Sequence, residues 1–248
     1  MNQPLLTSQS AQSYVRIAGV LLVLTMVAGF FGELYVPSRL VVPGDAAATV
    51  RNLGASNFLF RAGFAVYLVE AICDIALSLV FYVLLKPVDR NLALLAAFFG
   101  LVSTSLFGVA ELFYFAASIF VGHSVKGFPR DQLDAFAALS LRLYGVGGGI
   151  FMAFYGIASI LRGYLIYRSG YLPRILGALL AIAGMCFVMK NFLVVLAPAW
   201  ATDLLLAPMS LAVLSMAVWF LAKGVDSAKW EARAGIGVSV RRDPLTLP

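Results

Sequence analysis

The segment from Arg61 to Leu85 constrains the fold of this chain most. Its sequence, RAGFAVYLVEAICDIALSLVFYVLL, is long and apolar enough to cross a bilayer as a helix. It nevertheless carries Glu70 and Asp74 near its middle. Residues four apart share one helix face, so these carboxylates form an acidic stripe that Tyr67 and Ser78 extend. Because a carboxylate at mid-bilayer costs about 2.5–3.5 kcal/mol, we predict that this face contacts protein or trapped water rather than lipid.

The composition indicates a membrane protein throughout. Hydrophobic residues make up 62% of the chain, charged residues 12%, and the mean hydropathy is +0.94, whereas a soluble domain has about 25% charged residues. The net charge of +6 comes from residues scattered over several loops rather than from one basic face. We therefore expect the lipid bilayer as the partner and no nucleic acid.

Six apolar runs have the length of a membrane span. They cover residues 15–36, 61–85, 92–121, 133–161, 172–196 and 203–222. We predict an all-α, polytopic transmembrane helical bundle at residues 15–224. A polar tail, residues 1–14, precedes it, and residues 225–248 are expected to form a disordered tail.

The basic residues predict the orientation of this bundle. Eleven Lys and Arg residues, including Arg162, are predicted to lie on the side that holds both termini, and five on the opposite side. The other two, Arg142 and Lys190, lie within spans. By the positive-inside rule, both termini are cytoplasmic.

Two loops on the opposite side are longer than a turn. Asp45, followed by Ala-Ala-Ala-Thr, predicts the start of a short surface helix whose Val50 and Leu53 face the membrane. In the second loop, Asp131 is expected to cap the fourth span. His123, the only histidine, is expected to be solvated.

Several segments resemble the bacterial membrane family called domain of unknown function 4386 (DUF4386). The most specific are LLKPVDRNLALLAAFF at residues 84–99 and YRSGYLPRILG at residues 167–177, and the resemblance extends from Gly44 to Val225. It implies a bundle of six or seven helices in the bacterial cytoplasmic membrane, and it implies no activity. One departure is Gly100, where the family pattern leads us to expect an arginine.

Six ionisable residues from five spans are predicted to lie in the outer half of the membrane. They are Glu33, Glu70, Asp74, Glu111, Arg142 and Lys190. Charges in hydrocarbon are tolerable only when they are paired or hydrated, so we predict one shared polar pocket, with a dry inner half. Arg142 and Lys190 are the expected partners of Glu70 and Glu111. The remaining carboxylates are then either protonated or joined by a cation.

Small residues predict close packing of the fourth and fifth spans. Gly145, Gly149 and Gly156 share one face of the fourth span, and Gly177 and Gly184 share one face of the fifth. Such spacings let the backbones of neighbouring membrane helices approach closely.

The chain lacks the residues that several kinds of chemistry require. One histidine cannot build a multi-histidine zinc centre, and Cys73 and Cys186 lack CxxC partners. We therefore expect no metal site, no cofactor and no catalytic residue. The pattern favours a protein that binds or moves a small polar solute, cation or proton. The alternatives are an intramembrane enzyme acting on a lipid-like substrate, and a structural or assembly subunit whose buried charges only pair.

Overall fold

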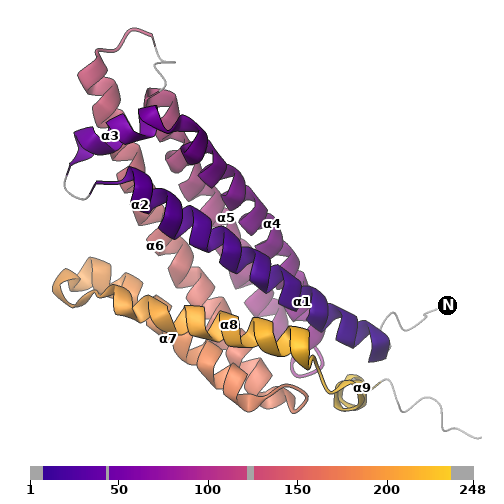
Figure 1. The fold of residues 1–248 in the computed structure, drawn as a ribbon. Helices are drawn as coiled ribbons and strands as arrows, with labels where there is room; N and C mark the ends of the chain where they lie inside the picture. Colours follow the sequence, from indigo (N-terminus) through magenta and orange to yellow (C-terminus); the bar gives the residue numbers. More distant parts are fainter. Residues whose placement is uncertain (1–7, 43–44, 122–125, 236–248) are drawn as a thin grey trace, which may run out of the picture.

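The computed structural model of the chain describes residues 8–42, 45–121 and 126–235, and Figure 1 shows their arrangement. His123 lies outside these residues. The helices are α1 (Ser8–Gly29), the π-helix η1 (Phe30–Tyr35), α2 (Val36–Leu40), α3 (Ala46–Ala55), α4 (Asn57–Leu85), α5 (Arg90–Val121), α6 (Arg130–Ser169), α7 (Arg174–Leu196), the short 3₁₀ helices η2 (Pro198–Trp200) and η3 (Asp203–Leu206), α8 (Ala207–Ala222) and α9 (Ser227–Ala234). No strand occurs among the described residues.

The predicted all-α bundle with six spans is confirmed. Six helical segments are long and apolar enough to cross a membrane. Each long helix packs against the next one in the chain, and α8 returns to pack against α1. Figure 1 shows α3 at one end of this bundle and α9 at the other. We call these the α3 end, where α4 begins, and the α9 end, where α4 finishes.

Two apolar clusters fill the bundle at different levels. One contains Leu77, Leu84 and Phe220 and lies toward the α9 end. The other contains Val36 and Phe107, together with buried side chains of α3, and lies toward the α3 end. Along α4, the carboxylates predicted to form a site fall between these two clusters.

The predicted range of the first span, residues 15–36, ends just before Pro37, but the helix does not end there. The helix continues to Leu40 through the π-helix η1, which contains Glu33. Proline has no N–H, and its ring collides with the carbonyl four residues earlier. The wider π turn before Pro37, with the amide of Val36 bonded to the carbonyl of Phe31, lets the chain pass this position without a break.

Helix α3 begins as predicted but faces differently. The carboxylate of Asp45 accepts a hydrogen bond from the amide of Ala48 at 2.8 Å, which confirms the cap. Val50 and Leu53 pack against the bundle and are 6% and 3% exposed, so the prediction that they face the membrane is wrong. Asp131 lies in the first turn of α6, and Pro129 occupies the cap position that we expected Asp131 to fill.

Glycines hold α6 and α7 together in antiparallel register. An added Cβ at Gly156 would lie 2.7 Å from the carbonyl oxygen of Gly184, and one at Gly163 would lie 2.6 Å from that of Gly177. The predicted close packing is therefore confirmed for these two helices. Gly145 is the exception, because it is exposed with no atom near its missing side chain.

The predicted disordered tail is wrong for residues 227–234, which form α9. Trp230 is fully buried, and its indole N–H donates to the carbonyl of Leu84 at 3.1 Å. Asp226 caps α9 by accepting from the amide of Lys229, and hydrogen bonds from the Lys229 side chain and backbone lower the pKa of Asp226. The cap is therefore intact at neutral pH and is lost as the pH falls through this lowered value.

Trp230→Phe should loosen α9 without unfolding the bundle. The substitution removes one buried hydrogen bond, worth about 1 kcal/mol, so the amides of α9 should exchange about fivefold faster in hydrogen–deuterium exchange. Trp200→Phe is the matched control, since Trp200 is 77% exposed. Equal exchange of α9 in both variants would contradict the anchoring role of Trp230.

Candidate functional site

The acidic stripe of α4 faces protein, as predicted. Tyr67, Asp74 and Ser78 are buried and Glu70 is half-buried, whereas Ile72 on the opposite face is 68% exposed. The lipid-facing surface of α4 is therefore apolar, and its carboxylates point into the bundle.

Four carboxylates from three elements form one electrostatic group, which we call the carboxylate cluster. Its members are Glu33 of η1, Glu70 and Asp74 of α4, and Glu111 of α5. The charge of Glu33 acts on each of the other three, and Glu70 also feels Asp74 and Glu111. Helix α1 approaches this group at Gly29, where a side chain would reach within 3.6 Å of Glu70 Oε1.

Glu111 is the most isolated member of the carboxylate cluster. It is 3% exposed, and neither of its carboxylate oxygens has a hydrogen-bond partner. Oε2 of Glu70 is likewise buried without a partner. Buried polar atoms are almost always hydrogen-bonded, so these oxygens are the acceptors in the cluster that a proton or a polar ligand would satisfy.

The expected ion pairs of Glu70 and Glu111 with Arg142 and Lys190 are wrong. Lys190 Nζ lies 2.8 Å from Oδ1 of Asp203, in η3. Arg142 is exposed on α6. Among the described residues, the other ion pair joins Lys229 to Asp226, far from the site. The structure therefore brings together the four predicted acids but not the two predicted bases.

Within the described part of the chain, the buried cation is Arg162, for which the sequence predicts a place at the cytoplasmic surface. It is 5% exposed, seven residues before the end of α6. Its Nη2 donates to Oγ of Ser78 at 3.0 Å, its guanidinium lies 5.1 Å from the ring of Phe81, and its charge acts on Asp74. The half of the bundle toward the α9 end is therefore not free of charge. The apolar run GYLIY after Arg162 was the signal that the helix continues past it.

Gly100 provides the space that Arg162 occupies. A Cβ at Gly100 would collide with Nη2 of Arg162 and would lie 2.6 Å from Oγ of Ser78. At this position we expected an arginine of α5, and the structure instead places a guanidinium of α6 beside Gly100.

Gly100→Ala should destabilise the protein by about 2 kcal/mol, the usual cost of overpacking a core. In a background with Arg162→Met and Ser78→Ala, which removes both the guanidinium and the hydroxyl that a Cβ at Gly100 would meet, the same change should cost less than about 0.5 kcal/mol. Thermal unfolding in detergent measures both. Gly108→Ala is the control, because nothing lies within 4 Å of a side chain there. Equal costs of Gly100→Ala in both backgrounds would show that Arg162 does not need this space.

Tyrosine hydroxyls border the carboxylate cluster. Tyr144 of α6 donates to the hydroxyl of Tyr67 at 2.8 Å, and Tyr67 donates to the carbonyl of Gly32 in η1 at 2.8 Å. The charge of Glu111 acts on Tyr67, Tyr114 and Tyr144. Hydroxyls and carboxylates hold hard cations or protons. Among the described residues, however, no three His, Cys, Asp or Glu side chains are close enough to hold one metal ion.

Comparison with known proteins gives a family and an archaeal relative. The profile of a family described as a domain of unknown function, DUF4386, matches residues 17–224. An uncharacterized protein of Archaeoglobus fulgidus is 30% identical over 122 residues, which are 49% of this chain and 60% of that protein. The chain thus spans less than two thirds of this relative's length. No solved structure matches this chain.

Proposed function

Because this chain belongs to the DUF4386 family, whose description assigns no activity, we propose a function from the site itself: the carboxylate cluster takes up protons inside the membrane. The observation that carries this proposal is Glu111, which is buried with two unpartnered oxygens. An ionised carboxylate in this position would cost several kcal/mol. A bound proton removes that cost without any further ligand.

A proton fits the site better than a metal cation does. A metal ion of the calcium or magnesium type needs about six oxygen ligands, whereas the described acids supply no group of three at one point. A proton needs one carboxylate, and Glu111 offers two buried oxygens without a partner. The cluster therefore supports proton exchange among several acids.

Protons reach the cluster from the α3 end in this proposal. Along its helix, Glu33 lies nearer to the α3 end than the other acids do, and it interacts with all three of them, so we assign it as the entry group. Toward the α9 end, the path meets the guanidinium of Arg162 and then a dry apolar cluster. This arrangement suits proton binding or proton-coupled movement of a solute and opposes an open proton channel. We place the protein in a bacterial cytoplasmic membrane with both termini inside.

The alternative in which the buried charges only pair has less support. It needs ion pairs within the site, and the described ion pairs, Lys190–Asp203 and Lys229–Asp226, do not include a member of the carboxylate cluster.

A hydrophobic carbodiimide tests the proposal, because it reacts with protonated carboxyl groups in apolar surroundings. The carboxyl proton passes to a carbodiimide nitrogen while the carboxylate oxygen adds to the central carbon, and the adduct rearranges to a stable N-acylurea. At neutral pH, mass spectrometry of membrane vesicles should find the adduct on Glu111 or Glu70, and Glu111→Gln combined with Glu70→Gln should remove it. Asp131 is the control acid, since it is exposed. Absence of any adduct on the carboxylate cluster would overturn the proposal.

A further inference from the structure

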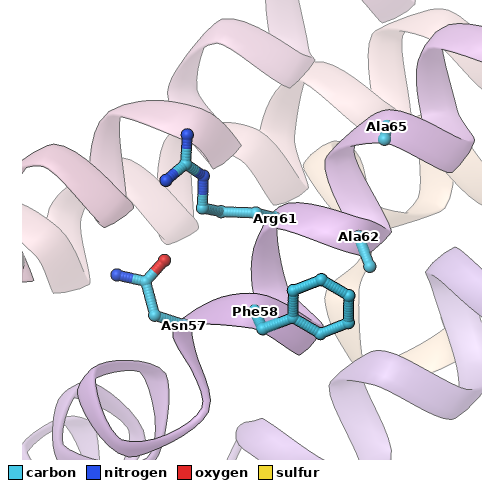
Figure 2. A pocket seen from close by; sticks show the side chains of 5 residues that line it. All are labelled: Asn57, Phe58, Arg61, Ala62 and Ala65. Atoms are coloured by element: carbon cyan, nitrogen blue, oxygen red, sulfur yellow. The ribbon is translucent and has the colours of Figure 1, made fainter.

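A hollow on the lipid-facing side of α4 lies close to the α3 end. It is lined by Asn57, Phe58, Arg61, Ala62 and Ala65. Figure 2 shows the polar side chains of Asn57 and Arg61 extending to one side of α4, and those of Phe58 and Ala62 to the other. Further along the helix, large side chains such as Leu68 and Ile72 cover the lipid-facing surface, so the two alanines leave a depression.

The length of α4 places this hollow at the membrane surface. Its 29 residues extend about 43 Å, which exceeds the hydrocarbon thickness by about 13 Å. About four residues at each end therefore lie among lipid head groups. Arg61, the fifth residue of α4, then lies at the hydrocarbon boundary, from which its long side chain reaches the phosphates, while Ala62 and Ala65 lie beside the first carbons of the acyl chains. Phe58 is 87% exposed, as expected for an aromatic ring at this boundary.

The charges around the hollow favour an anion. Arg61 is exposed, and the described ion pairs do not include it. Asn57 also borders a second depression, which is lined by Arg51, Arg130 and Asp134. Three arginines and one acid thus surround Asn57, and a guanidinium matches the geometry of phosphate oxygens.

From this juxtaposition we propose that the hollow binds one anionic phospholipid. The phosphate is held by Arg61 with the amide of Asn57, and an acyl chain covers Ala62 and Ala65 beside the ring of Phe58. The apolar half of the hollow decides between the possible sources of phosphate. A free phosphate ion would contact neither the exposed phenylalanine nor the depression within the acyl region, whereas the acyl chain of a lipid would pack against the ring and fill the depression. This inference is independent of proton uptake by the carboxylate cluster.

Native mass spectrometry of the full chain, titrated in detergent with phosphatidylglycerol, tests the site. Arg61→Gln should weaken the first lipid-binding event about tenfold, because a charge-assisted hydrogen bond is lost. Ala65→Leu should weaken it to a similar degree by filling the hollow while every charge remains. Arg39→Gln is the matched control: Arg39 is also an exposed arginine at the α3 end, and it lines neither depression.

The competing outcomes are distinct. Equal losses in Arg61→Gln and Arg39→Gln would show that the lipid is attracted only by general surface charge. Phosphatidylcholine binding as tightly as phosphatidylglycerol would show that the anionic head group is not selected. Displacement of the lipid by glycerol 3-phosphate at similar concentration would assign the site to a soluble phosphate. Any of these results overturns the proposal, and size-exclusion profiles matching the wild type establish that each variant is folded.

Discussion

Gly163→Ala should destabilise the protein, whereas the same substitution at Gly148 on the same helix should stabilise it. A Cβ at Gly163 would lie 2.6 Å from the backbone nitrogen of Ala181 and 2.6 Å from the carbonyl oxygen of Gly177. These are backbone atoms, so the two helices must separate. We expect a cost of about 2 kcal/mol. At Gly148 nothing lies within 4 Å, so alanine should add about 0.5–1 kcal/mol by favouring the helix.

A larger side chain at Gly163 should have a larger effect. Gly163→Leu cannot be accommodated by a small separation and should prevent α6 and α7 from pairing, with a loss of more than about 3 kcal/mol. Circular dichroism during thermal unfolding in detergent compares the stability of the alanine variants. The yield of monodisperse protein shows whether Gly163→Leu folds. Stabilisation by Gly163→Ala would show that α6 and α7 lie further apart than the structure places them.

Glu111→Leu should make the protein more stable and at the same time remove its function. Leucine has a volume similar to that of glutamate and leaves no unpartnered oxygen in the interior, so the free energy of unfolding should rise by about 2 kcal/mol. Glu111→Gln keeps two polar atoms in the same place and should change stability much less. Both variants should lose the protonatable group, and the leucine variant should therefore separate folding from proton uptake.

The contrary result for Glu111 is equally clear. If Glu111→Leu lowers the free energy of unfolding by about 3–5 kcal/mol, Glu111 has a buried partner that the variant leaves unpaired. Glu231→Leu serves as the control for removing an acid outside the spans, because Glu231 lies on α9.

Much of this fold could be predicted from the sequence because length and hydropathy alone decide it. Apolar runs indicate the six spans, Asp45 has the position of a helix cap, and residues four apart show that Glu70 and Asp74 share a face. The spacing of Gly156 and Gly177 from other small residues indicates close helix packing. Each of these signals is local to one helix.

The partners of the charged residues could not be predicted in the same way. Distance along a helix gives the depth of Arg142 and Lys190 but not the direction in which either side chain points. Lys190 pairs with Asp203 outside the long helices, and no helical period relates these residues. Arg162 directly follows the fourth predicted span, and basic residues near span ends usually lie in the head-group region. Its burial depends on space beside Gly100, a residue of another helix.

Infrared difference spectroscopy of the purified protein detects proton uptake by the carboxylate cluster itself, because the C=O stretch of a protonated carboxyl group is separate from that of a carboxylate. We expect a protonated-carboxyl band at neutral pH that disappears as the pH is raised. This band should be weaker in Glu111→Gln and unchanged in Asp131→Asn. A wild-type spectrum without that band, or one identical to the spectrum of Glu111→Gln, would contradict proton uptake by the carboxylate cluster.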